Sequence, residues 1–283
     1  MNDDASRSDH NAAALQGAIA AAVPERECIV AGGRRLTWHQ VTDRTCRFAG
    51  LLAGAELGLR SDPDPGACEP WESPHDHVAL YLHNGPEYLE GMLGAWKARC
   101  VAINVNYRYV ANELAYVLRD SDAAAVVYHA SFASTLREVL PDLPSVRLLL
   151  QVDDGTETAL LDGAAEYEAA LAAADPLDPA GLSPDDRYIL YTGGTTGMPK
   201  GVLWRQGDFL ATCLGVRGTS ADLVATATRR AHRCGRSRRR PSCTGPRTGT
   251  PSRRSSRAAP SWCRTNPRGS TPRTCWPPAS ASG

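Results

Sequence analysis

Residues 192–200 combine the side chains and the backbone freedom that a phosphate-binding loop requires. These nine residues include three glycines, three threonines and one lysine, and they follow the strand-like run of residues 187–191 directly. Glycine lets backbone N–H groups approach a ligand closely, threonine hydroxyls add hydrogen-bond donors, and lysine adds a positive charge. We therefore predict a polyphosphate site formed by Thr192, Gly193, Gly194, Thr195, Thr196, Gly197 and Lys200.

Three other interpretations of this loop can be compared with the phosphate site. Glycine-rich segments also occur as mobile surface turns, and composition alone leaves that alternative open. The Walker P-loop places a hydroxyl residue directly after its lysine, whereas Gly201 follows Lys200 here. A dinucleotide-binding G-x-G-x-x-G turn opens a helix, and no helical pattern begins inside this loop. The loop therefore matches neither of these two motifs.

The elements before the loop predict an α/β fold, with a parallel sheet flanked by helices, because short apolar segments alternate with helical patterns. Ligands of such sheets bind beyond the carboxyl ends of strands, which is where this loop lies. Thr37 and Gln40 fit a helix-capping box. Predicted strands cover residues 27–31, 34–37, 77–83, 101–105, 123–129, 146–152 and 187–192. Predicted helices cover residues 38–53, 87–99, 110–118 and 160–174, and the second should bury Leu89, Met92, Leu93 and Trp96 on one face.

The stretch YTGGTTGMPKGV resembles the phosphate-binding signature of the AMP-forming adenylating enzymes, the superfamily of acyl-CoA synthetases, peptide-synthetase adenylation domains and luciferases. The usual signature reads [YF]-T-S-G-[ST]-T-G-x-P-K-G, and this chain departs from it at Gly194, where serine is more usual. Glycine there, followed by VLWRQ, is similar to actinobacterial acyl-CoA synthetases for fatty acids or steroid side chains. The resemblance covers about residues 12–217.

The resemblance implies an ATP-dependent ligase. In this family a substrate carboxylate attacks the α-phosphate of ATP, pyrophosphate leaves, and the thiol of coenzyme A then displaces AMP to give a thioester. The segment from Thr192 to Gly197 would hold the β- and γ-phosphates, and Lys200 would orient the loop and neutralise charge. These are binding roles, so no catalytic acid or base is assigned. Trp204 and Arg205 are candidates for substrate contact or for packing.

The resemblance also implies parts that follow this loop in the family: a Thr-Glu motif whose glutamate holds Mg²⁺, and a smaller domain that carries an adenylation lysine. The chain's two lysines are Lys97 and Lys200, and no acidic residue follows Asp222. We therefore expect the N-terminal part of a synthetase only, with ATP, a carboxylic acid and coenzyme A as family substrates. We also expect weak ATP binding and no complete thioester formation by this polypeptide.

The last part of the sequence has a different composition from the rest. All 31 Asp and Glu lie within residues 1–222 beside 17 Lys and Arg, whereas residues 223–283 contain 14 Arg and no acidic residue. Few large apolar side chains are available there to offset the entropy cost of ordering, so we predict disorder. The expected organisation is a partial AMP-binding domain over residues 1–217 and an Arg/Ser/Pro-rich tail over residues 218–283.

Two hypotheses could explain this tail. Its residue alphabet is typical of a G+C-rich gene read out of frame, which favours a frameshift between Asp208 and Leu223. The alternative is a non-enzymatic fragment whose cationic cluster RRAHRCGRSRRR binds nucleic acid through phosphate contacts. Because the tail lacks lysine and has only two isolated tryptophans for base stacking, we expect no specific nucleic-acid partner.

The remaining features favour a cytoplasmic protein without a membrane span. The N-terminal residues are polar and acidic, and no apolar run approaches the 18 or so residues that a span requires. The nine cysteines are scattered, and the His232-x-Cys234 pair lacks the other ligands of a zinc site, so we expect no bound metal. His77 and His83 are expected to lie at the ends of a strand, without a catalytic role.

Overall fold

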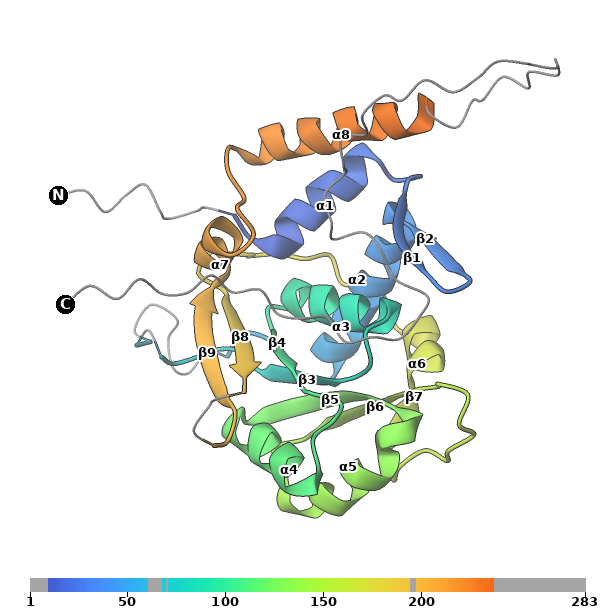
Figure 1. Cartoon of the computed structure of the whole chain (residues 1–283), viewed down its shortest axis with the longest axis vertical. Coiled ribbons are helices and arrows are strands. Elements are labelled where there is room, and N and C mark those ends of the chain that lie inside the picture. The colour runs from blue at the N-terminus through green and yellow to red at the C-terminus, as the bar shows by residue number, and fades with distance from the viewer. Residues whose placement is uncertain (1–9, 61–67, 70, 194–196, 237–283) are drawn as a thin grey trace, which may run out of the picture. The chain divides into compact units, whose positions relative to one another are not determined.

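A computed structural model describes the backbone of residues 10–60, 68–69, 71–193 and 197–236. Figure 1 shows these residues as a sheet with helices on both faces. This arrangement confirms the predicted α/β fold. Within the described ranges, no helix is both long and apolar enough to cross a bilayer.

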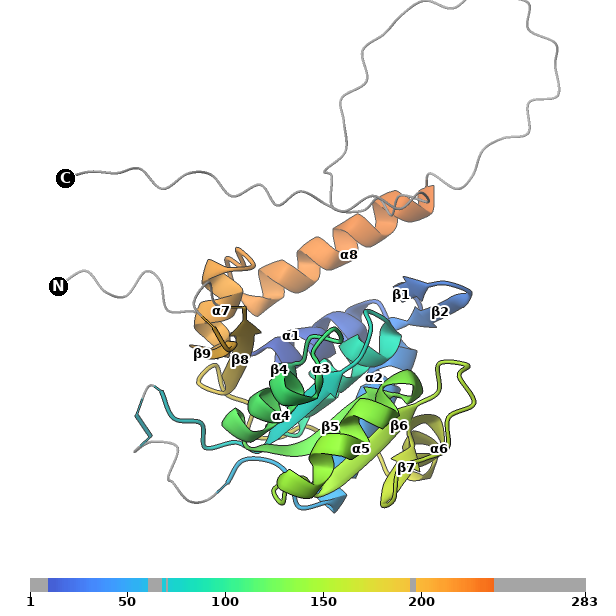
Figure 2. The ribbon, with the colours of Figure 1, turned by 60° about the horizontal axis from the view of Figure 1, so that its bottom comes forward.

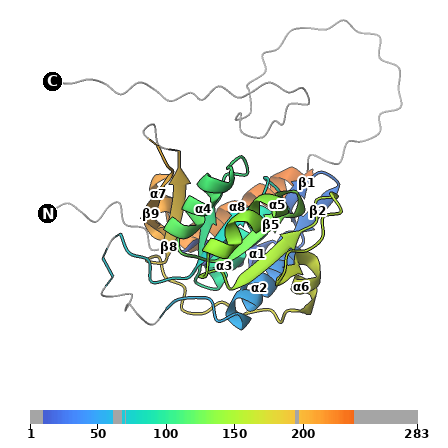
Figure 3. The same cartoon turned by 90° about the horizontal axis from the view of Figure 1, so that it is seen from below.

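The main sheet has seven strands in the order β7-β6-β5-β3-β4-β8-β9, and a separate two-stranded sheet pairs β1 with β2. Every neighbouring pair in the main sheet is parallel except β8 and β9, which are antiparallel. The β8–β9 hairpin therefore lies at one side of the sheet, as Figure 3 shows. The strands are β1 (Glu27–Ala31), β2 (Arg34–Thr37), β3 (His77–Tyr81), β4 (Val101–Asn104), β5 (Ala123–His129), β6 (Leu148–Val152), β7 (Ala164–Glu166), β8 (Arg187–Thr192) and β9 (Lys200–Arg205).

Helices cover the two faces of the sheet and bury an apolar core on each side (Figure 2). One core lies beneath α4 and α5 and the other beneath α2, α3 and α6. Because the central strands β3 and β5 are covered on both faces, all their residues are buried, which explains their nearly continuous apolar sequences. The helices are α1 (Ala12–Ala22), α2 (Trp38–Gly54), α3 (Pro86–Lys97), α4 (Ala111–Asp120), α5 (Ala133–Val139), α6 (Tyr167–Ala173), α7 (Gln206–Thr212) and α8 (Ser220–Arg236).

The first hairpin and the helix after it form as predicted. Strands β1 and β2 have the predicted bounds, with Gly32 in the left-handed region at φ +55°. The Thr37 hydroxyl accepts a hydrogen bond from the Gln40 amide, and the Gln40 side chain accepts one from the Thr37 amide. This capping box satisfies N–H groups at the start of α2 that have no partner within the helix.

The predicted apolar face of α3 is wrong in part. Trp96 is buried as expected, but Leu89 is 41% exposed. Small residues form much of the buried face instead, since a Cβ added at Gly94 would lie 2.6 Å from Cδ1 of Phe48 on α2. The two helices therefore pack too closely to admit a larger side chain at this position.

The predicted helix over residues 160–174 is also wrong in its first half. Gly163 has φ +76°, and residues 164–166 form strand β7 against β6. Helix α6 begins at Tyr167, where the Glu166 carboxylate accepts hydrogen bonds from the amides of Glu168 and Ala169. Sheet pairing and this cap therefore delay the helix by about two turns.

Helix α8 corrects the prediction of disorder from residue 223, because residues 220–236 are helical. Thr219 and Asp222 exchange hydrogen bonds between their side chains and backbone amides at the start of the helix. Alanine and arginine, which are frequent in α8, are good helix formers. Residues 237–283 of the expected tail lie outside the described residues.

The first helix is fixed by residues from much later in the chain. The Asn11 side chain caps α1 and also donates to the Ser183 carbonyl at 2.9 Å. The Gln206 side chain accepts from the Ala12 amide at 3.1 Å, and His10 is hydrogen-bonded to the Gly218 carbonyl at 2.8 Å. These contacts join both ends of the described chain into one folded unit.

Candidate functional site

The two ends of the glycine-rich loop lie side by side on the β8–β9 hairpin. Thr192 is the last residue of β8, Lys200 is the first residue of β9, and the two are register partners. Directly opposed residues of an antiparallel pair place their side chains on the same face. Because both residues are exposed, a hydroxyl and an ammonium group face solvent together at this edge of the sheet.

Part of the loop itself lies within the described residues. Gly197 has φ +140°, a conformation that residues with side chains rarely adopt. A Cβ added at Gly193 would meet no atom within 4 Å, so the start of the loop borders open space. The predicted residues Gly194, Thr195 and Thr196 lie outside the described residues.

An asparagine outside the predicted site holds this strand in place. Asn104 at the end of β4 donates from Nδ2 to the Tyr191 carbonyl at 3.0 Å and accepts from the Tyr191 amide at 2.8 Å. Backbone pairing of β4 with β8 consists of the single bridge between Ile103 and Ile189. The Asn104 side-chain amide thus takes the place of a backbone peptide group in pairing with β8, at the residue directly before Thr192.

The Tyr191 side chain fixes the same strand from the opposite direction. Its hydroxyl donates to the Asp120 carboxylate at 2.7 Å, and burial together with that carboxylate raises the pKa of Tyr191. Its ring lies against Gly201, where an added Cβ would come within 3.0–3.1 Å of ring carbons. Glycine at position 201 therefore allows β9 to close onto β8.

Aromatic and imidazole rings gather at the carboxyl ends of the neighbouring strands. His83, just after β3, has its ring centroid 4.7 Å from that of Tyr107 and 4.8 Å from that of Phe132. The His83 backbone amide donates to Nδ1 of His129 at 3.0 Å, and burial lowers the pKa of His129. His83 therefore lies at the end of a strand, as predicted, and belongs to a cluster of rings at the edge that carries Thr192.

Trp204 and Arg205 lie at the other end of the hairpin from the loop. Arg205 lies five residue steps along β9 from Lys200, which corresponds to about 17 Å along a strand. Arg205 forms ion pairs with Asp185 and Asp208, and Trp204 packs against Phe209. The structure therefore does not bring these two candidates together with Thr192 and Lys200.

The described part of the site offers the Lys200 ammonium group and the Thr192 hydroxyl to an anionic ligand, but no cluster of metal ligands. Among the residues whose side chains are described, no three His, Cys, Asp or Glu lie together in a way that could hold an ion. The described residues therefore fit phosphate oxygens and do not supply a Mg²⁺ site of their own.

The sequence of this chain is similar to one protein family and to acyl-CoA ligases of actinobacteria. The family model described as "AMP-binding enzyme" matches residues 18–237. The chain is 49% identical over 206 residues to the medium-chain acyl-CoA ligase Mig of Mycobacterium avium, covering 72% of this chain and 37% of that protein. It is 42% identical over 188 residues to the 3-oxocholest-4-en-26-oate–CoA ligase of Rhodococcus rhodochrous, covering 66% and 31%. The chain thus spans about a third of the length of these relatives.

Solved structures show the same fold. The anthranilate CoA ligase AuaEII in complex with anthranoyl-AMP matches with a TM-score of 0.62 at 19% identity, covering 73% of this chain and 36% of that one. The N-terminal domain of FACL13 from Mycobacterium tuberculosis matches with a TM-score of 0.55 at 26% identity, covering 69% and 44%.

Proposed function

The chain belongs to the AMP-binding enzyme family, and from that premise we propose that it forms the phosphate-binding part of an ATP-dependent acyl-CoA synthetase. The observation that carries the proposal is the pairing of exposed Thr192 with exposed Lys200 across the glycine-rich loop. The whole enzyme would join a carboxylic acid to AMP and then transfer the acyl group to the thiol of coenzyme A.

In this proposal the hairpin binds and orients ATP. Lys200 would place its ammonium group against the β- and γ-phosphate oxygens, while the Thr192 hydroxyl and the loop amides donate hydrogen bonds. Hydrogen bonds to charged groups contribute about 1.5–3 kcal/mol each, and donors that are already in place stabilise the charge that develops on departing pyrophosphate. The two hydrogen bonds between the Asn104 side chain and the Tyr191 backbone would keep these donors in position.

The acyl substrate we propose is a fatty acid or a steroid side-chain acid. The names of the two relatives above indicate medium-chain and cholestenoate substrates for those proteins. The similarity covers only about a third of the length of those two relatives. The proposal for the substrate class therefore rests on relatedness, and the proposal for ATP binding rests on the hairpin.

Binding of ATP to the purified chain tests the phosphate site. We expect Lys200→Ala to weaken ATP binding by about 10–100-fold in calorimetric titration, the factor that corresponds to one lost charge-assisted hydrogen bond. Arg187→Ala is the matched control, because it removes one positive charge from the opposite end of the same hairpin. Equal ATP affinity in the Lys200→Ala and unmodified chains would contradict the site, as would an equal loss in the control.

A further inference from the structure

A serine and a histidine lie within hydrogen-bond distance at the amino end of β3, on the edge opposite Thr192. Nε2 of His77 lies 2.8 Å from Oγ of Ser73. The other ring nitrogen, Nδ1, is hydrogen-bonded to the backbone carbonyl of Ser121. A carbonyl can only accept, so Nδ1 carries the proton. Nε2 is then the acceptor, and the Ser73 hydroxyl donates to it.

The surroundings of His77 favour its neutral form. The residue is 8% exposed, and burial lowers its pKa. A neutral imidazole with a free lone pair on Nε2 is the state that can accept a proton from a nearby hydroxyl. The Ser121 carbonyl fixes the tautomer and orientation of the ring, which is one of the two roles that a carboxylate has in a serine–histidine–aspartate triad.

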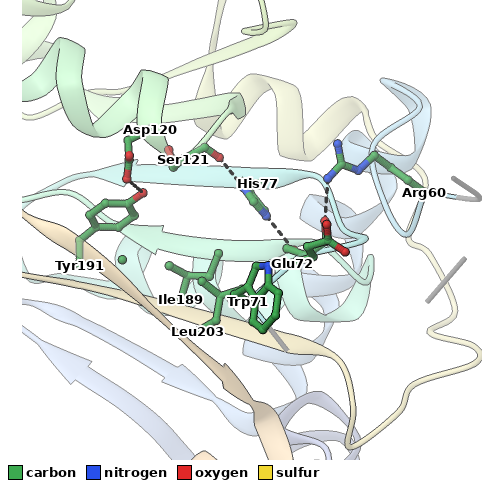
Figure 4. A pocket seen from close by; sticks show the side chains of 11 residues that line it. Arg60, Trp71, Glu72, His77, Asp120, Ser121, Ile189, Tyr191 and Leu203 are labelled. Carbon is green, nitrogen blue, oxygen red and sulfur yellow. Dashed lines mark hydrogen bonds between the residues drawn. The ribbon is translucent and has the colours of Figure 1, made fainter. Parts of the chain in front are cut away.

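This pair opens into a pocket of about 380 Å³, shown in Figure 4. A volume of this size is within the range of small-molecule sites. Apolar side chains from both strands of the hairpin and from the loop before β3 form part of its lining: Ile189, Leu203 and Trp71. Ser73 is half-buried and lines this pocket.

A cation lies beside the serine. Arg60 lines the same pocket, and its Nη2 donates to the backbone carbonyl of Ser73 at 2.7 Å. Its Nε is buried without a hydrogen-bond partner in the described part of the chain. Arg60 therefore adds a positive charge beside the pocket, which favours an oxyanion there, so a nucleophile, a base, a group that orients the base and a cation lie around one pocket.

We propose that Ser73 and His77 form a second active site, which hydrolyses small uncharged carboxylic esters. Oγ of Ser73 forms a bond to the ester carbonyl carbon while Nε2 of His77 takes the hydroxyl proton, and Arg60 stabilises the resulting oxyanion. The carbon–oxygen bond to the alcohol then breaks, and the alcohol leaves with the proton from His77. Water attacks the acyl-serine, His77 removes a proton from that water, and the same proton returns to Oγ of Ser73 as the acid departs.

The test combines a covalent probe with a chromogenic ester. Incubation of the full chain with a fluorophosphonate should attach the phosphonate to Ser73, as located by peptide mass spectrometry. Hydrolysis of p-nitrophenyl butyrate should fall by about 10²–10⁴-fold in Ser73→Ala, and the label should disappear. His77→Gln should slow labelling of Ser73 by a similar factor.

Ser145→Ala is the matched control. Ser145 is also a half-buried serine hydrogen-bonded to a backbone carbonyl, that of Ala123, but it lies outside the pocket. Its labelling and hydrolysis should equal those of the unmodified chain. Absence of label at Ser73, label on a different residue, or hydrolysis unchanged in Ser73→Ala would each overturn the proposal. Urea denaturation shows whether each variant folds, and if His77→Gln does not fold, Ser73→Ala alone decides the outcome.

Discussion

Replacement of Asn104 by alanine tests whether one side chain holds the phosphate-binding hairpin on the sheet. The substitution removes both hydrogen bonds to the Tyr191 peptide, at 2.8 and 3.0 Å, and leaves its N–H and C=O groups without those partners. Backbone pairing between β4 and β8 consists of the single bridge from Ile103 to Ile189, so no backbone hydrogen bond between these strands replaces the two that are lost.

The size of the effect follows from the burial of Tyr191. An unsatisfied buried polar group costs about 1–3 kcal/mol, and Tyr191 is 6% exposed, although water can reach the opening left by Asn104. We therefore expect Asn104→Ala to lower the free energy of unfolding by about 2–4 kcal/mol. With a denaturant slope near 2 kcal/mol/M, the midpoint in urea should fall by about 1–2 M.

Circular dichroism in urea gives the midpoint, and hydrogen exchange gives the local effect at the Tyr191 amide. Asn106→Ala is the matched control, since Asn106 accepts one exposed hydrogen bond from the Arg108 amide at 3.0 Å. We expect a loss below about 1 kcal/mol for that variant. The reasoning is refuted if both variants unfold at the same midpoint, or if exchange of the Tyr191 amide is unchanged in Asn104→Ala.

Three further predictions concern stability, each measured by urea denaturation. Glu90→Ala should lower the free energy of unfolding by about 3–5 kcal/mol, because it removes a fully buried carboxylate that pairs with Arg44 at 2.8 Å. Glu168→Ala removes a half-exposed partner of the same arginine and should lower it by less than about 1 kcal/mol. Equal losses in the two variants would contradict this ranking. Gly201→Ala should cost about 1–3 kcal/mol through overpacking against its cross-strand neighbour, and an unchanged midpoint would exclude that contact. Burial lowers the pKa of His77, so the unfolded chain takes up a proton first as the pH falls. Stability should therefore be lost below about pH 6.5, by at most about 1.4 kcal/mol per pH unit for this histidine, and His77→Gln should reduce that loss; an identical pH dependence in the variant would contradict it.

The elements that could be predicted from the sequence are those that local chemistry determines. The hairpin of β1 and β2 follows from a two-glycine turn between two short segments, and the start of α2 follows from the capping box at Thr37. Strand β5 is buried throughout, and its sequence of seven consecutive residues without a charge indicates this directly.

The elements that were predicted incorrectly depend on contacts between distant segments. Leu89 is large and apolar and is therefore expected to be buried, but it is exposed, and α3 instead approaches α2 through Gly94, which packs against Phe48. Similarly, the count of large apolar residues after residue 222 gave no indication of α8, because helix propensity and the cap at Thr219 stabilise it instead.

The candidate site shows the same division. Thr192, Gly197 and Lys200 could be selected because their residue types and spacing suit phosphate chemistry. Asn104 could not, because nothing in its neighbourhood of the sequence indicates that its amide replaces a peptide group of β8, 87 residues further along the chain. Ser73 and His77 are only four residues apart in the sequence, but it is the path of the loop into strand β3 that brings their side chains together.

The attachment of α1 to late segments has a consequence for how the polypeptide is made. Asn11 emerges from the ribosome early, yet the Ser183 carbonyl that its side chain binds, and the Gln206 side chain that covers the next amide, emerge more than 170 residues later. At about 5–20 residues per second, the first helix must wait on the order of ten seconds or more without these partners. The amino-terminal segment therefore stays without these hydrogen bonds until late in the synthesis of the domain.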